Sequence, residues 1–206
     1  IHVGSVVTYE DELMMLNNKY FVGRALDNRI GGFMIAEVAR ILKEKKKKLN
    51  FGLYIVNAVQ EEIGLRGAEM IAKKIKPHVA IVTDVCHDTQ SPLYSKTLVG
   101  DVWCGKGPVL SYGPAIQNNL LEMIMKTAKA AKIPYQIKAV SEHTNTDTES
   151  FAYSMEGVAS ALISLPLKYM HTTVETAHKD DIENLIKLMY EFLIQLKPGY
   201  DFRYIK

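Results

Sequence analysis

Short apolar runs typical of strands alternate along this chain with longer segments that repeat with the period of a helix. We expect strands over 51–59, 78–83, 135–140 and 158–164, and helices from Asp27 onward and over 65–75, 117–131 and 179–196. Strands separated by helices of ten or more residues favour parallel pairing. The sequence therefore predicts an α/β fold, with a mostly parallel mixed sheet flanked by helices on both faces.

Two regions depart from this alternation. Residues 1–22 form short strand-like segments divided by polar turns, and 92–115 is rich in Gly and Pro and is typical of irregular strands and loops. A chain of 206 residues with 48% hydrophobic content can bury a full core. This size suits one domain, with a fragment of another.

Composition argues against two classes of partner. The formal net charge is only +2, and the dense basic run Lys43–Lys48 has no interleaved aromatic residues to stack on bases. We therefore expect no nucleic-acid partner. No apolar run is long enough to span a bilayer, so we expect no membrane partner. Cys86 and Cys104 form no disulfide framework and suit reduced thiols in the cytoplasm.

A pair of adjacent carboxylates, Glu61 and Glu62, directly follows the apolar run 53–59. Neighbouring residues at a strand end point in different directions, so one carboxylate can bind a metal while the other faces a substrate. Burying such a pair costs several kcal/mol unless a cation or strong donors compensate. The pair therefore predicts a site with further partners.

Suitable partners follow other predicted strands or turns: Asp27, Asp84 and His171. In a parallel sheet, ligands gather at the carboxyl ends of the strands, so these side chains are expected at one edge. Each residue alone is a weak signal, because an Asp after a strand is usually a helix cap or a turn residue. Carboxylate and imidazole ligands together suit zinc, cobalt or manganese.

Four segments of the chain resemble the M42 family of metallo-aminopeptidases, which includes the TET and glutamyl aminopeptidases and some proteins labelled endoglucanase. These segments are Ala25–Gly32, Val59–Ala68, Thr83–Val85 and Lys168–Thr172. Their order and spacing match the family as well as their letters do, and the similarity extends from His2 to about Leu196. The fold that this implies is of the zinc-aminopeptidase type.

The resemblance implies a site with two divalent metal ions, zinc or cobalt, with manganese as an alternative. The implied metal ligands are Asp27, Glu62, Asp84 and His171. Asp27 would bridge both ions, and Glu61 would be the general base and acid. The family also tends to have a cis peptide bond after the bridging aspartate, here Asp27–Asn28.

One family element has no counterpart in this chain. The family has an earlier histidine ligand in a His-x-Asp motif, and nothing before Asp27 has that form. The chain therefore resembles a family member without its first strands, its first helix and most of an inserted β dimerisation domain. Residues 1–17 would be the last strands of that insert, and 18–206 the catalytic domain.

The implied activity is removal of N-terminal residues from short peptides. Where the family has Gly-Thr-Asp-Ala, this chain has Thr146-Asp147 within a run of bulkier residues. We expect Asp147 and His143 to contact the substrate. Helix capping explains Asp147 equally well. The alternatives are a related metal-dependent amidase or deacylase, and a catalytically inactive fragment or assembly subunit. The resemblance also implies a homo-oligomer, from a dimer to a dodecamer.

Overall fold

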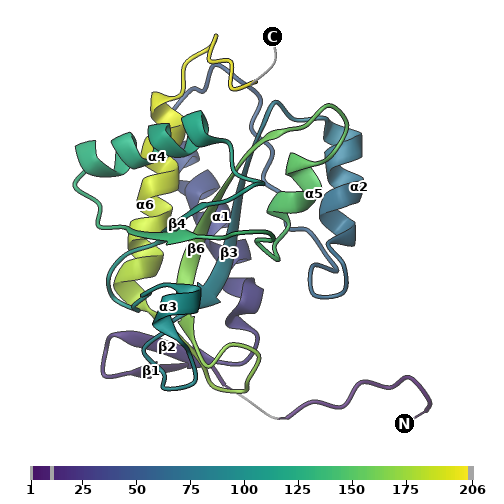
Figure 1. Cartoon of the computed structure of the whole chain (residues 1–206), viewed down its shortest axis with the longest axis vertical. Coiled ribbons are helices and arrows are strands. Elements are labelled where there is room, and N and C mark those ends of the chain that lie inside the picture. Colours follow the sequence, from purple (N-terminus) through teal and green to yellow (C-terminus); the bar gives the residue numbers. More distant parts are fainter. Residues whose placement is uncertain (1, 10–11, 204–206) are drawn as a thin grey trace.

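The computed structural model describes residues 2–9 and 12–203 (Figure 1). The strands are β1 (Met14–Leu16), β2 (Tyr20–Gly23), β3 (Val79–His87), β4 (Val109–Tyr112), β5 (Gln136–Ala139), β6 (Ala159–Lys168) and β7 (Glu175–His178). The helices are α1 (Leu26–Glu44), α2 (Arg66–Ile75), α3 (Lys96–Val99), α4 (Asn118–Ala130), α5 (Thr148–Ala152) and α6 (Lys179–Gln195).

All the strands belong to one mixed sheet. The order is β1-β2-β7-β6-β4-β5, and β3 lies beside β6. The long β3–β6 pair, from Val79 opposite Ala159 to His87 opposite Leu167, is parallel, as is β4–β5. The other pairs are antiparallel. The mixed α/β sheet is confirmed. Parallel pairing is limited to these two pairs, because short turns such as that between β1 and β2 permit only antiparallel neighbours.

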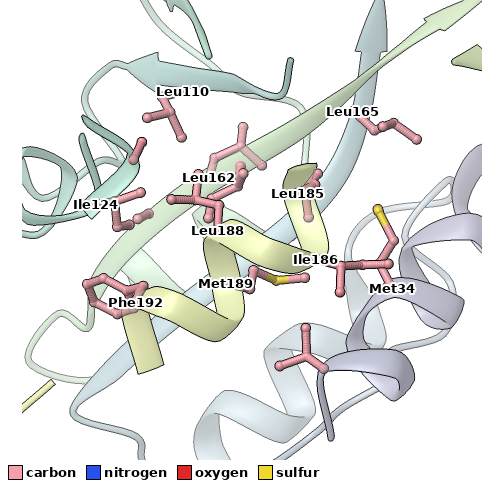
Figure 2. Packing of buried hydrophobic residues seen from close by; sticks show 14 of the residues in the cluster. Met34, Leu110, Ile124, Leu162, Leu165, Leu185, Ile186, Leu188, Met189 and Phe192 are labelled. Carbon is pink, nitrogen blue, oxygen red and sulfur yellow. The ribbon is translucent and has the colours of Figure 1, made fainter. Parts of the chain in front are cut away.

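The main core lies where α1 and α4 each pack on α6 and on the sheet. Along α1, the buried residues Ile30, Met34, Val38 and Leu42 repeat every four positions and form the apolar stripe expected of a helix that covers a sheet. Figure 2 shows α6 between two groups of side chains, with Ile186 near Met34 of α1 and Leu188 on the side of α4. The helix α6 is thus the centre of the core.

The remaining long helix, α2, packs against the short helix α5, which in turn contacts β3 and β6. In Figure 1, α2 and α5 lie on one side of the β3–β6 pair, and α4 and α6 lie on the other side. The expected flanking helices are therefore confirmed. The carboxyl ends of β3 and β6 and the beginnings of α1 and α2 lead into loops that carry the candidate site residues.

The segment 51–59 differs from the prediction. It was expected to be a buried strand, but it has no strand assignment and pairs with no strand. Phe51 and Leu53 still pack against the core, so the apolar pattern is used for side-chain burial. The segment has no strand partner, because β3 pairs with β6 alone among the described strands. Residues 2–9, also strand-like in sequence, form no strand either.

The predicted domain boundary between residues 17 and 18 falls in the turn that joins β1 to β2, two strands that pair with each other. The division into residues 1–17 and 18–206 stays a prediction. Among the described residues, we find no helix with both the length and the apolar character needed to cross a bilayer.

Candidate metal centre

Three of the predicted metal ligands come together in the structure. Asp27, Glu62 and His171 each offer one ligand atom, and these atoms all lie within 4.8 Å of one another. The His171 Nε2 atom is 3.0 Å from Asp27 Oδ2 and 3.5 Å from Glu62 Oε2. The three residues come from the beginning of α1, the loop before α2 and the loop between β6 and β7. Tertiary folding alone brings them to one place.

Asp27 occupies an irregular first turn of α1. Ala25, the residue before the helix, has a left-handed conformation with φ of 54°, and both Asp27 and Asn28 have non-helical backbone angles. The Asp27–Asn28 peptide bond is cis, as the family resemblance implies. The regular helix therefore begins after Asn28, and Asp27 lies on a bend rather than on a helical face.

Asn28 connects this bend to the end of β3. Its Nδ2 atom donates to the Thr83 carbonyl oxygen and to Asp84 Oδ1, both at 3.0 Å, and its Oδ1 accepts from the Gly31 amide at 2.9 Å. A Cβ on Gly31 would lie 2.3 Å from Asn28 Oδ1, so a larger residue at position 31 would force the Asn28 side chain to move. Sequence analysis did not assign Asn28 a role.

Asp84 lies beside the three-residue cluster but does not belong to it. Its carboxylate is buried and accepts from Asn28 Nδ2 and from the Val85 amide, the latter at 2.8 Å. Burial, with the nearby charges of Glu61 and Asp27 acting in the same direction, raises the pKa of Asp84 to about 8, although the hydrogen bond from the Val85 amide lowers it. The raised pKa indicates that this negative charge lacks a cationic partner among the described protein groups.

Glu61 also lies within this acidic group. Burial raises its pKa to about 7, and the charges of Asp147, Glu62 and Asp27 act in the same direction. Burial likewise raises the pKa of Asp27 to about 6, with the charge of Glu62 adding to it. Several carboxylates thus repel one another in a partly buried space, an arrangement that a bound cation would stabilise.

Glu175, at the beginning of β7, is a site residue that sequence analysis missed. Its side chain is buried, and its two oxygens accept from the backbone amides of Asp27 and His171, at 3.0 and 2.7 Å. It therefore holds the backbone at two candidate ligands. A strand of four residues is too short to give a periodic signal, so nothing in the sequence distinguished this glutamate from an exposed one.

The two residues expected to contact substrate differ in position. Asp147 lines the same cavity as Asp27, Glu61 and Asp84, and its Oδ1 atom is buried without a hydrogen-bond partner among the described residues. Burial raises its pKa to about 6. His143 is exposed, lies 3.4 Å from Glu149 through its Nδ1 atom, and does not line that cavity. The structure brings Asp147 toward the acidic group but not His143.

Comparison with known proteins supports the family resemblance. Residues 1–188 match the family model described as M42 glutamyl aminopeptidase. The chain belongs to the M42 family. The resemblance that the sequence motifs indicated is therefore confirmed, and the described relatives are named as aminopeptidases, which are hydrolases.

Three M42 relatives illustrate the similarity. The chain is 37% identical over 196 residues to the lysyl aminopeptidase of Pyrococcus furiosus. This alignment covers 95% of this chain and 55% of that protein. The TET aminopeptidase of a marine-sediment Thaumarchaeota archaeon matches with a TM-score of 0.84 at 31% identity, covering 91% of this chain and 53% of that one. The TET1 peptidase of Pyrococcus horikoshii, which can assemble into a tetrahedron or a large octahedral shell, matches with a TM-score of 0.73 at 28% identity, covering 91% and 54%. The chain thus spans about half the length of these relatives.

The chemistry of this donor set fits the metal ions that an M42 fold implies. Carboxylate oxygens and one imidazole nitrogen are ligands of zinc, cobalt and manganese. Asp27, Glu62 and His171 converge closely enough to share one ion. Asp84 offers a further carboxylate, joined to the Asp27 bend through Asn28. Glu61 adds a carboxylate with a raised pKa beside them.

Proposed function

We propose that this chain carries the metal-binding and proton-transfer residues of an aminopeptidase that removes N-terminal residues from short peptides. The observation that supports this most is the convergence of Asp27, Glu62 and His171 to within 4.8 Å, with Glu61 beside them. The family membership supports the same reaction class. Because the chain spans about half of its relatives, the activity is proposed for the polypeptide that contains it.

Each acidic residue has a distinct part in this proposal. Asp27, Glu62 and His171 hold one divalent ion, and Asp27 with Asp84 contributes to a second. Zinc or cobalt suits these ligands best, with manganese as an alternative. When bound, such ions lower the pKa of a water molecule and stabilise the negative charge that develops on the substrate oxygen. Glu175 orients two of the ligands through their backbone amides.

Glu61 carries the proton in this proposal. With a pKa near 7, its carboxylate can accept a proton from the attacking water and later donate it to the nitrogen of the leaving amine. A carboxylate whose pKa is close to the working pH suits both steps, and such acid–base catalysis contributes on the order of 10²–10⁴-fold to the rate. Glu62, although adjacent in sequence, is assigned to metal binding.

Asp147 is proposed to bind the free amino group of the substrate. Its Oδ1 atom is buried without a partner and lines the cavity that contains Glu61 and Asp84. An α-ammonium group would supply both the missing hydrogen bond and the opposite charge. This favours an aminopeptidase over an amidase or deacylase, which does not need to bind a free amine. A substrate contact by His143 stays a prediction, because that side chain is exposed and pairs with Glu149.

Self-assembly is the last part of the proposal. We infer a homo-oligomer, from a dimer to a dodecamer, because related TET peptidases assemble into a dodecamer or into larger shells. Short peptides are the proposed substrates, and no nucleic-acid or membrane partner is proposed. The cytoplasm suits the two free thiols, Cys86 and Cys104.

Hydrolysis of a panel of aminoacyl-p-nitroanilides tests the chemistry. The polypeptide that contains this chain is first treated with a chelator, and zinc or cobalt is then added back. We expect turnover that depends on the metal and that is abolished by Glu61→Gln. The control Glu122→Gln, an exposed position on α4, should retain this turnover. N-acetylated substrates should not be cleaved, and equal cleavage of both would support the amidase instead. A folded polypeptide that contains this chain and shows no turnover with any metal would support the inactive fragment or assembly subunit.

A further inference from the structure

A serine side chain joins the two helices that follow Asp147 and Glu61. The short helix α5 begins directly after Asp147, and the loop that carries Glu61 leads into α2. These two helices pack side by side (Figure 1). The hydroxyl of Ser150 in α5 donates to the carbonyl oxygen of Leu65, the residue before α2, at 3.2 Å. Ser150 and Leu65 are 85 positions apart in the sequence, so this hydrogen bond is a tertiary contact between the two elements.

On the α2 side, this contact reaches Glu61 through the backbone. The amide of Leu65 donates to the carbonyl oxygen of Glu61 at 3.0 Å. The ends of the loop are also joined, because the Gly67 amide donates to the carbonyl oxygen of Val59 at 3.0 Å. A Cβ on Gly67 would lie only 2.3 Å from that oxygen. Two consecutive hydrogen bonds therefore connect Ser150 to the backbone of Glu61, within a loop whose ends are closed.

On the α5 side, the segment that carries Asp147 is fixed by its own hydrogen bonds. Thr146 and Thr148 flank Asp147 and are buried, and the Thr146 hydroxyl donates to that of Thr148 at 2.8 Å. The Glu149 carboxylate accepts from the amide and the hydroxyl of Thr144. A buried polar network of this kind rigidifies the backbone that contributes to it. The position of Asp147 thus depends on where α5 lies.

We propose that Ser150 is a positioning residue that sets the distance between Asp147 and Glu61, and that this distance selects the peptide bond next to the free amine. The inference rests on the proposed function, in which Asp147 binds the substrate ammonium group and Glu61 transfers the proton. Both side chains line the same cavity.

The chemistry of the substrate requires a fixed distance. In an N-terminal residue, the amino group and the scissile carbonyl carbon are bonded to the same Cα atom, so their separation is set by covalent geometry. The group that binds the amine and the group that activates the water have to match this length. A misplacement of about 1 Å can lower a rate on the order of 10²-fold. The hydrogen bond from Ser150 to Leu65 joins the two elements that carry these groups.

Two substrates that differ in this length test the inference. The polypeptide that contains this chain is assayed with the aminoacyl-p-nitroanilide that it cleaves fastest, and with its β-homo analogue. In the analogue, one additional CH2 group separates the amino group from the carbonyl carbon. We expect the ratio of kcat/KM for the first substrate to that for the analogue to fall at least ten-fold in Ser150→Ala. Ser150→Thr keeps the hydroxyl and should retain the ratio.

Ser154→Ala is the matched control. The Ser154 hydroxyl donates to the carbonyl oxygen of Phe151 at 2.9 Å, a contact between neighbouring residues at the end of α5. This variant removes the same atom from the same part of the chain, and it should leave the ratio unchanged. Hydrogen exchange provides a measurement that needs no turnover. We expect Ser150→Ala to speed exchange at least three-fold in residues 61–67 and Ser154→Ala to leave it unchanged.

The outcomes separate this inference from the proposed function. If Ser150→Ala lowers kcat/KM equally for both substrates, the inference is overturned and the proposed function stands. Unchanged exchange in residues 61–67 would also overturn the inference, because Ser150 would then not hold the loop. Absence of turnover by the unaltered, metal-loaded polypeptide would overturn the proposed function and this inference with it.

Discussion

Glu175 accepts a hydrogen bond at 3.0 Å from the backbone amide of Asp27, a residue 148 positions away in the sequence. Its second carboxylate oxygen accepts from the amide of His171 at 2.7 Å. The Glu175 side chain is buried, so its carboxylate depends on these two amides for its hydrogen bonds. One carboxylate therefore sets the distance between two candidate metal ligands without being a ligand itself.

Glu175→Gln tests this positioning role. A glutamine offers one acceptor oxygen in place of two, so one of the two backbone amides loses its partner. We expect the affinity for zinc or cobalt to fall roughly 10–100-fold, the range typical of residues that orient ligands. A competition titration with a coloured chelator measures this. Glu183→Gln, an exposed residue on α6, is the matched control and should leave metal affinity unchanged.

Two adjacent glycines in α1 should respond differently to alanine. A Cβ on Gly31 would lie 2.3 Å from Asn28 Oδ1, whereas one on Gly32 would lie 3.3 Å from Asn57 Oδ1. Alanine gains up to about 1 kcal/mol of helix propensity at either position. We expect Gly31→Ala to lose roughly 1–3 kcal/mol of unfolding free energy through overpacking, and Gly32→Ala to change it little. Urea unfolding distinguishes them, and equal effects would contradict the close contact with Asn28.

The stability of the metal-free chain should fall as pH rises. The pKa of Asp84 is about 8 in the folded chain, above its ordinary value of 3.8. Between about pH 4 and 8 the unfolded chain has lost this proton while the folded chain keeps it, so the contribution is fully present at low pH and is lost as pH rises toward 8. Asp84→Asn should flatten the pH profile, by up to about 1.4 kcal/mol per pH unit for one proton. Thermal unfolding across this range measures it, and an unchanged profile would contradict the burial of an uncompensated carboxylate.

Phe192 gives a test of the core. Its side chain in α6 is fully buried, and Figure 2 shows it near the α4 side of the cluster. Phe192→Ala should cost roughly 3–5 kcal/mol of unfolding free energy, the range for truncating a buried aromatic side chain. Phe33→Ala on α1 is the control, because Phe33 is 57% exposed. Denaturant unfolding of both variants measures the two changes in unfolding free energy. Equal losses would contradict the described packing.

The long amphipathic helices could be predicted from the sequence with good accuracy. The helices expected over 117–131 and 179–196 are observed as α4, Asn118–Ala130, and α6, Lys179–Gln195. Their apolar residues repeat over several turns, so the signal is local and strong. The failure at 51–59 has a different cause. The apolar pattern of this segment predicted a strand, but a strand also needs a neighbour, and the described residues supply none.

The candidate site could be predicted only in part. Asp27, Glu62 and His171 converge because the ends of strands and the starts of helices meet at one edge, a rule that sequence can use. Asn28 and Glu175 could not be found in this way. Both act through hydrogen bonds to residues far away in the chain, and no local pattern encodes such contacts.

The three clustered residues come from positions 27, 62 and 171, so an ion held by them would join segments that are far apart in the unfolded chain. Such an ion binds the folded state far better than the unfolded state. At a free metal concentration of one hundred times the dissociation constant, the folded state would gain about 2.7 kcal/mol by mass action. Metal supply would then control resistance to proteases as well as chemistry. A cell that withholds the ion would also shorten the lifetime of the protein.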